Sequence, residues 1–208
     1  REKPDILVMT GDFTDLYTRW TPARAALFRE IRPRLGAFAV TGNHEAYFDQ
    51  GRALSFIADA GFRLLQGTSC VIRDGGRDVM AVAGVDDPAM GLTQNERAVL
   101  TKARSGGLFT LFLKHQPVAA KATRGLFDLQ LSGHSHGGQI FPFHLLAAIP
   151  YTKLSGRADF SQGSTLYVSR GSGYWGPPIR IFAPREITVI DLVRRGAEGP
   201  DKGGGQNP

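Results

Sequence analysis

Two histidines, His134 and His136, stand one residue apart at the end of an apolar run with strand character, Leu129–Ser132. In extended backbone, residues i and i+2 point to the same side, so both imidazoles can face one point. Glycines on either side of the pair allow the backbone to turn tightly and to come close to a bound group. Converging imidazoles are typical of metal sites, although a histidine-rich surface turn would show the same spacing.

Three other apolar runs also end in side chains that bind metal ions in proteins. They are Ile6–Thr10, followed by Gly11 and Asp12; Ala37–Thr41, followed by Gly42, Asn43 and His44; and Leu108–Lys114, followed by His115. In open α/β sheets, sites form in the crevice beyond the carboxyl ends of the strands. The repeated pattern therefore predicts one site assembled from four strand ends, and it makes a chance surface turn a poor explanation of the two histidines.

The order of these motifs resembles that of calcineurin-like metallophosphoesterases. The matching residues are Gly11-Asp12, Gly42-Asn43-His44-Glu45, His115 and Gly133-His134-x-His136, and the resemblance runs from about Pro4 to Leu192. The form Gly-His-Ser-His-Gly-Gly-Gln, with Tyr167–Gly171 and Ala183–Thr188 downstream, is similar to one bacterial branch. That branch includes membrane-associated phosphodiesterases similar to UDP-diacylglucosamine hydrolases.

The resemblance implies two divalent metal ions that form a nucleophile from water. One ion would be held by Asp12, Asn43, His115 and His134. The other would share Asp12 as a bridge and take His136. Mixed nitrogen and oxygen ligands favour manganese, iron or zinc over calcium.

One part of the family pattern is missing from this chain. The family carries an Asp-x-His motif on a strand before the Gly-Asp strand, and this sequence has none. We therefore expect that the first strand and two further ligands lie upstream of Arg1, and that this chain holds one of the two metal sites well.

We also predict roles for three polar residues that are not metal ligands. By resemblance, His44 protonates the leaving oxygen or stabilises the transferring phosphoryl group; the alternative is packing beside the site. Glu45 is expected to support the backbone rather than to bind metal. Arg170 is predicted to contact a substrate phosphate, with a surface ion pair as the alternative.

The elements that must position these residues follow from turn and cap signals. We expect helices from Thr21-Pro22 to Gly36, over Gly51–Ala60, from Thr93 or Asn95 to Arg104, and over Val118–Thr123, a hairpin around Asp74–Arg77, and late strands at Ile179–Phe182 and Glu186–Val193. The fold class is α/β, with two packed mixed β-sheets flanked by helices, the α-β-β-α metallophosphoesterase sandwich. We expect residues 1–193 to form one domain that lacks the first strand of the family, and residues 194–208 to form a disordered tail.

Composition restricts the function classes further. The chain has 208 residues, 42% of them hydrophobic, and a net charge of +6. A single cysteine, Cys70, rules out a disulfide within the chain. No basic run alternates with aromatic residues, so a nucleic-acid platform is not indicated. No apolar stretch reaches the roughly 18 residues of a membrane span, and any anchor or signal would lie upstream of Arg1.

Three functions are compatible with these residues. The leading one is hydrolysis of a phosphoester or pyrophosphate bond in a small phosphorylated, lipid-linked or nucleotide-sugar substrate. The second is a phosphoesterase of the same fold acting on nucleotides, cyclic nucleotides or phosphoproteins. The third is a non-catalytic metal-binding scaffold. The leading function places the protein at a bacterial membrane, by peripheral contact, or in the cytoplasm; the oligomeric state is left open.

Overall fold

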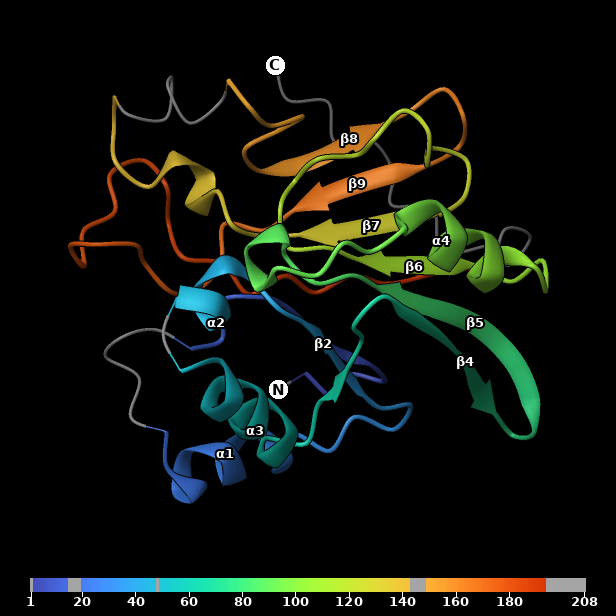
Figure 1. Cartoon of the computed structure of the whole chain (residues 1–208), viewed down its shortest axis with the longest axis horizontal. Coiled ribbons are helices and arrows are strands. Elements are labelled where there is room, and N and C mark those ends of the chain that lie inside the picture. The colour runs from blue at the N-terminus through green and yellow to red at the C-terminus, as the bar shows by residue number, and fades with distance from the viewer. Residues whose placement is uncertain (1, 15–19, 48, 143–148, 194–208) are drawn as a thin grey trace, which may run out of the picture.

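Two β-sheets packed against each other form the centre of the computed structural model, which describes residues 2–14, 20–47, 49–142 and 149–193 (Figure 1). The first sheet is parallel, with β1 (Leu7–Thr10), β2 (Ala37–Val40) and β3 (Arg63–Leu64) in that order. The second is mixed, in the order β4 (Thr68–Asp74), β5 (Arg77–Gly84), β6 (Thr110–Leu113), β7 (Leu129–Ser132), β9 (Thr165–Val168) and β8 (Gly156–Asp159). The helices are α1 (Pro22–Arg29), α2 (Asn43–Tyr47), α3 (Gln50–Asp59) and α4 (Glu96–Arg104), with 3₁₀ turns η1 (Pro88–Met90) and η2 (His136–Gly138).

Alternating side chains on the strands create the layers. Phe38 and Val40 of β2 point toward the second sheet and pack with the Met80 side of β5. Ala39, between them, points the other way and packs with residues of α1 and α3. The opposite side of β5, including Ala81, packs in one cluster with residues of α4. Because each sheet buries both faces, the helices lie outside a double sheet, and the predicted α-β-β-α fold is confirmed.

The local turn and cap signals locate most elements correctly. The hairpin between β4 and β5 turns at Asp74–Arg77, as predicted. Asn95 caps α4, since its Oδ1 accepts a hydrogen bond of 3.0 Å from Ala98 N. The first helix ends at Arg29 rather than near Gly36, because Pro33 disfavours helical backbone at the residue before it, and Arg32 has a φ of +49°.

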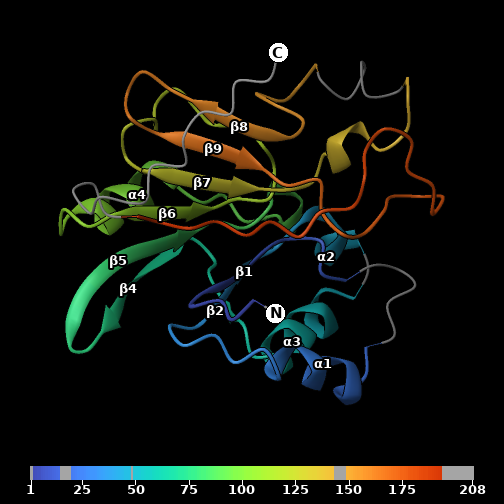
Figure 2. The ribbon, with the colours of Figure 1, turned by 180° about the vertical axis from the view of Figure 1, so that it is seen from behind.

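Several expected elements are wrong. Residues 118–120 are irregular and residues 121–123 lie in a turn, so the expected helix is absent there, and neither 179–182 nor 186–193 is a strand. Figure 2 shows the last of these as an extended red segment that runs past β6. Its sequence alternates like a strand, but a strand also needs a neighbour to complete the ladder, and none pairs with it among the described residues. The sequence also did not predict α2 or β8, and the expected tail, 194–208, lies outside the described residues.

The parallel strands carry their following loops to one end of the sandwich. The pairs β1–β2 and β6–β7 are both parallel, so the residues after each strand emerge at the same edge of their sheet. None of the helices in the described part of the chain is long and apolar enough to cross a membrane. The fold therefore gathers the four ligand-bearing loops beside α2 (Figure 1).

Replacing Phe112 with alanine is expected to lower the free energy of unfolding by about 3–5 kcal/mol, because this ring is fully buried between the second sheet and α4. Denaturant titration measures the change. Phe182→Ala removes a ring that is 87% exposed and should change the free energy by less than about 0.5 kcal/mol. Equal losses for the two variants would contradict the assignment of this core.

Candidate metal centre

Four side chains from the four strand ends meet around one nitrogen atom. His115 Nε2 lies 3.1 Å from Asp12 Oδ2, 3.1 Å from Asn43 Oδ1 and 2.9 Å from His134 Nδ1. Asp12, His115 and His134 each offer a ligand atom, and these atoms lie within 4.8 Å of one another. The predicted convergence of Asp12, Asn43, His115 and His134 is therefore present in the fold.

The outer sides of both imidazoles are already hydrogen-bonded. His115 Nδ1 is 2.7 Å from the carbonyl of Thr10, so it must donate there. In the neutral ring, His115 Nε2 then carries a lone pair. His134 Nε2 is 2.7 Å from the hydroxyl of Tyr151, which leaves Nδ1 facing the cluster. The four nitrogen and oxygen atoms that face one another carry lone pairs, and there are not enough hydrogen atoms to bridge all of them. Such a set of nitrogen and oxygen ligands fits a divalent transition-metal ion.

The charges of the cluster suit a cation. Burial opposes ionisation of Asp12, but the hydrogen bond and positive charge of His115 outweigh it and lower the pKa of Asp12 to about 2. Burial, reinforced by the nearby His115, lowers the pKa of His134, which favours the neutral ring. Burial also works against a charged His115, yet Asp12 raises the pKa of that ring overall. Asp12 thus supplies a negative charge that draws positive charge to the centre.

Unusual backbone conformations hold the ligands in place. Asp12, His134 and His136 have φ values of +54°, +66° and +49°, a region that costs a non-glycine residue about 1–2 kcal/mol. Such strain clusters at functional sites. At Gly11, an added Cβ would lie 2.5 Å from His115 Nδ1, and at Gly42 it would overlap the carboxylate of Asp12. The glycines before the ligands are therefore required for close approach of the loops.

His136 lies outside this cluster and contacts an arginine. Its Nδ1 is 2.9 Å from Arg180 Nη2, and burial, with the charge of Arg180, lowers its pKa to about 4. Arg180 Nη1 also donates to the backbone carbonyl of His136 at 3.3 Å, which ties the loop after β9 to η2. Within that loop, Arg180 donates to the backbone carbonyls of Arg170 and Gly173. The sequence interpretation overlooked Arg180, although its place inside an apolar segment was a usable signal.

Arg170 makes the ion pair that was the alternative interpretation of this residue. Its Nε donates to Glu186 Oε2 at 2.8 Å, and the other oxygen of Glu186 accepts from Tyr167 at 2.6 Å. The substrate contact predicted for Arg170 stays a prediction.

His44 is placed directly beside the cluster. It follows Asn43 on α2, and its backbone N–H donates to Asp12 Oδ1 at 3.0 Å. Its ring lies 5.7 Å from that of Tyr47, centroid to centroid. The fold thus brings the backbone of His44 to the ligand set, and the proton-donor role of its ring stays a prediction.

A buried carboxylate near the centre, Asp87, was not predicted from the sequence as a site residue. Asp87 is 2% exposed and accepts hydrogen bonds of 2.9 Å from Gln116 Nε2 and from Ala89 N. Burial is the largest influence on the pKa of both His115 and His134 and lowers it, and the negative charge of Asp87 acts in the opposite direction. Asp87 follows the carboxyl end of β5, so the strand-end rule that found the other residues could have found it as well.

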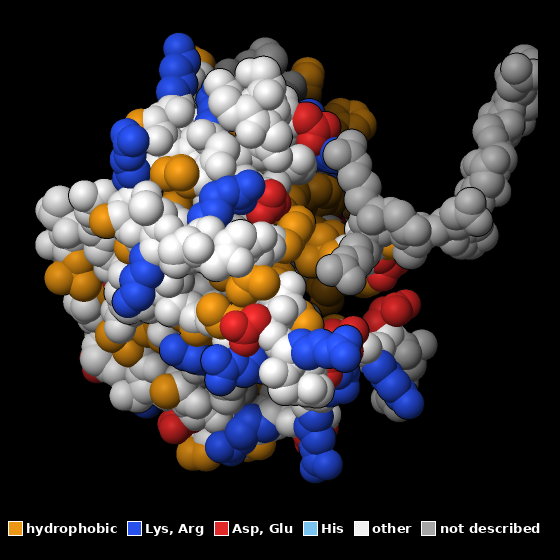
Figure 3. Space-filling view, turned by 90° about the vertical axis from the view of Figure 1, so that its right-hand side faces the viewer, with side chains coloured by type: hydrophobic (Ala, Val, Ile, Leu, Met, Phe, Trp, Pro, Cys, Tyr) orange, Lys and Arg blue, Asp and Glu red, His pale blue; other side chains and the backbone are white. Residues whose placement is uncertain are grey.

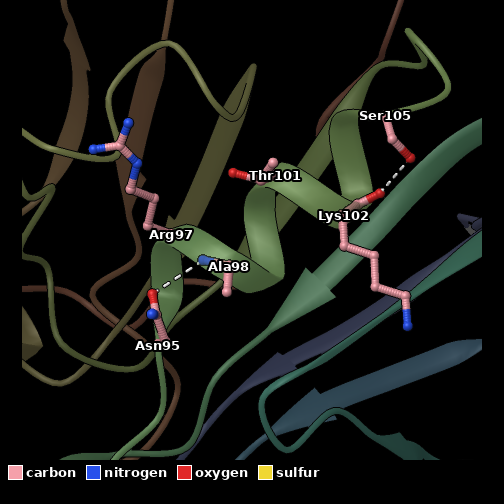
Figure 4. Close-up of a pocket in the computed structure, with 6 residues that line it drawn as sticks. All are labelled: Asn95, Arg97, Ala98, Thr101, Lys102 and Ser105. Carbon is pink, nitrogen blue, oxygen red and sulfur yellow. Dashed lines mark hydrogen bonds between the residues drawn. The ribbon is translucent and has the colours of Figure 1, made fainter.

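A shallow depression on α4 contains none of these residues. Asn95, Arg97, Ala98, Thr101, Lys102 and Ser105 line it (Figure 4). Its hydrogen bonds are the helix's own, from Ala98 N to Asn95 and from Ser105 to the Lys102 carbonyl. On the face of the molecule in Figure 3, lysine and arginine side chains are scattered among acidic, neutral and hydrophobic ones. Neither feature offers a second candidate site.

Comparisons with known proteins agree with this geometry. A family model described as calcineurin-like phosphoesterase matches residues 1–138, which include every proposed metal ligand. An uncharacterized metallophosphoesterase of Aquifex aeolicus is 35% identical over 94% of this chain and 76% of its own length. A Danio rerio transmembrane protein with metallophosphoesterase domain is 33% identical over 91% of this chain, which spans 46% of it. The crystal structure of the Haemophilus influenzae NAD nucleotidase is similar in fold, with a TM-score of 0.53 and 14% identity over 80% of this chain and 40% of that one.

Proposed function

Because this chain belongs to the calcineurin-like phosphoesterase family and is therefore a metallophosphoesterase, we propose that it hydrolyses a small phosphorylated substrate that carries an apolar group. The observation that supports the chemistry is the meeting of four possible metal-ligand atoms, which are His115 Nε2 and the three atoms of Asp12, Asn43 and His134 that lie within 3.1 Å of it. The apolar part of the proposal rests on an exposed surface beside that centre.

Each site residue has a role in this proposal. Asp12, Asn43, His115 and His134 would hold one divalent ion of manganese, iron or zinc, and His136 would serve a second ion that shares Asp12. When bound, such ions polarise a phosphoryl oxygen and lower the pKa of water to about 7. Thr10 and Tyr151 orient the two imidazoles of the cluster through their outer nitrogens.

His44 is the proposed general acid. Its backbone N–H is used to hold Asp12, so the position of its side chain is linked to that of the ligand. The ring protonates the departing oxygen once the phosphorus–oxygen bond begins to break. A non-catalytic metal-binding scaffold would have no use for a proton donor at this position.

The exposed surface consists of Phe141, Trp175, Ile179 and Phe182, and we call it the aromatic surface. These side chains are 52%, 65%, 52% and 87% exposed. Phe141 and Phe182 contact each other with ring centroids 5.8 Å apart. Clustered exposed apolar side chains commonly mark binding sites.

The aromatic surface is tied to the His136 turn through Gln139. This buried side chain accepts from Trp175 N at 2.6 Å and donates to Trp175 O at 2.6 Å. Figure 1 shows the loop after β9 at the left, beside η2. An acyl chain or similar group could therefore rest on this surface while its phosphate reaches the metal centre. A substrate of that kind is held in a membrane, so we extend the proposal to peripheral membrane contact here.

Replacing Trp175 and Phe182 together with alanine should raise KM about tenfold or more for a phosphoester with a long acyl chain. The same variant should leave KM unchanged for a short-chain ester with the same head group, because only the long chain covers the aromatic surface. Steady-state kinetics on the matched pair measures this. The control, Val71→Ala, removes a side chain that is 46% exposed on β4, far along the chain from either loop, and should affect neither ester.

The substrate panel also separates the remaining functions. Nucleotides and cyclic nucleotides belong in it, since the structure similar in fold is named a nucleotidase. Preference for a nucleotide, with no effect of the double variant, would overturn the apolar substrate and keep the hydrolase. A metal-loaded protein that cleaves no phosphoester in the panel would be a scaffold.

A further inference from the structure

Glu45 is a fully buried carboxylate for which the proposed reaction has no direct use. Its Oε2 accepts hydrogen bonds from Asp12 N at 2.9 Å and Gly42 N at 2.7 Å. Its Oε1 accepts from Thr14 N at 2.9 Å and Thr14 Oγ1 at 3.1 Å. All four donors are backbone amides or a hydroxyl rather than cationic side chains. A buried charge is costly unless its hydrogen bonds are complete, and here each oxygen accepts two.

These bonds join the two loops that carry metal ligands. Asp12 and Thr14 follow β1, whereas Gly42 follows β2 and precedes Asn43. The link is reciprocal, because His44, the neighbour of Glu45, donates its N–H back to Asp12 Oδ1. Asp12 is thus held by its backbone through Glu45 and by its side chain through His44. The carboxylate also satisfies the N–H of a residue that has the strained φ of +54°.

We propose that Glu45 is a positioning residue for Asp12, which keeps the ligand cluster assembled before a metal ion binds. It does not touch the metal or the substrate. It holds the β1 and β2 loops at the separation at which Asp12 Oδ2 and Asn43 Oδ1 both lie 3.1 Å from His115 Nε2. The inference rests on the proposed function in that the ion held there serves hydrolysis, but metal binding can be measured without turnover.

Glutamine is the informative replacement. It has nearly the shape of glutamate, but one oxygen becomes an NH₂ group, which donates and cannot accept. In Glu45→Gln, the new NH₂ group must face either the two amides of Asp12 and Gly42 or the amide and hydroxyl of Thr14. All of these groups are hydrogen-bond donors, so the NH₂ group cannot accept from them. One loop is therefore released while the core volume stays the same.

The experiment is calorimetric titration of the folded, metal-free protein with Mn²⁺ alone, well below its melting temperature. Loss of a residue that hydrogen-bonds to a metal ligand typically weakens metal binding about 10–100-fold, and we expect the loss in Glu45→Gln to fall in that range. The matched control is Asp128→Asn, because Asp128 accepts from Thr110 N and Arg104 Nη1 at the other end of the strands. It should lower the melting temperature and leave the Mn²⁺ dissociation constant unchanged.

Two results would overturn the inference: a folded Glu45→Gln protein with unchanged Mn²⁺ affinity, or an equal loss of affinity in Asp128→Asn. If Glu45→Gln does not fold, Thr14→Val decides, since it removes only the hydroxyl donor to Oε1. A smaller loss of Mn²⁺ affinity supports the inference, and an unchanged affinity overturns it. A chain that depends on Glu45 for Mn²⁺ but cleaves no phosphoester would overturn only the proposed function.

Discussion

Asp12→Ala is expected to abolish tight binding of divalent ions at both proposed positions. Asp12 is the carboxylate of the cluster, it lies 3.1 Å from His115 Nε2, and it is the proposed bridge between the ions. Without it, the remaining ligands of the cluster are neutral imidazoles and an amide, which hold a dication far less well. The measurement is metal content by mass spectrometry after dialysis of the purified protein.

The histidine variants should separate the two positions. His134→Ala removes a cluster ligand and should empty mainly the first site. His136→Ala should empty mainly the other, because His136 lies outside the cluster. Asp5→Ala is the control, since Asp5 is an exposed carboxylate paired with Arg34 and should keep the full metal content. If Asp12→Ala also keeps its metal, the bridge assignment is wrong.

His44→Ala should keep the metal ions and lose turnover by about 10²–10⁴-fold, the usual contribution of general acid–base catalysis. The backbone N–H that holds Asp12 is present in alanine as well, so the ligand set should stay in place. Metal content and kcat are measured on the same preparations.

The size of the loss should depend on the leaving group. A p-nitrophenolate departs with little protonation, whereas an alkoxide needs a proton. His44→Ala should therefore lose less activity on an aryl ester than on an alkyl ester. Equal losses on both esters would indicate that His44 stabilises the phosphoryl oxygens electrostatically. An unchanged rate would indicate that His44 only packs beside the site.

The sequence by itself determined the fold class and the meeting of the cluster ligands. Parallel strands present their carboxyl ends at one edge of a sheet, so the strand-end pattern predicts that Asp12 lies near Asn43 and that His115 lies near His134. The packing of the two sheets then brings the two pairs together. The hairpin at Asp74–Arg77 and the cap at Asn95 were equally predictable. In each case the information lies within a few neighbouring residues, where backbone preferences act.

Only the tertiary structure decided which groups support the ligands. Glu45 reaches Asp12 across 33 positions, Arg180 reaches His136 across 44, and Thr10 reaches His115 across 105. The segment 186–193 shows the same limit, because its strand-like alternation has no neighbour that completes a ladder among the described residues. Local periodicity encodes what a residue prefers, whereas a hydrogen bond between distant segments also requires that the whole fold place its partner within about 3 Å.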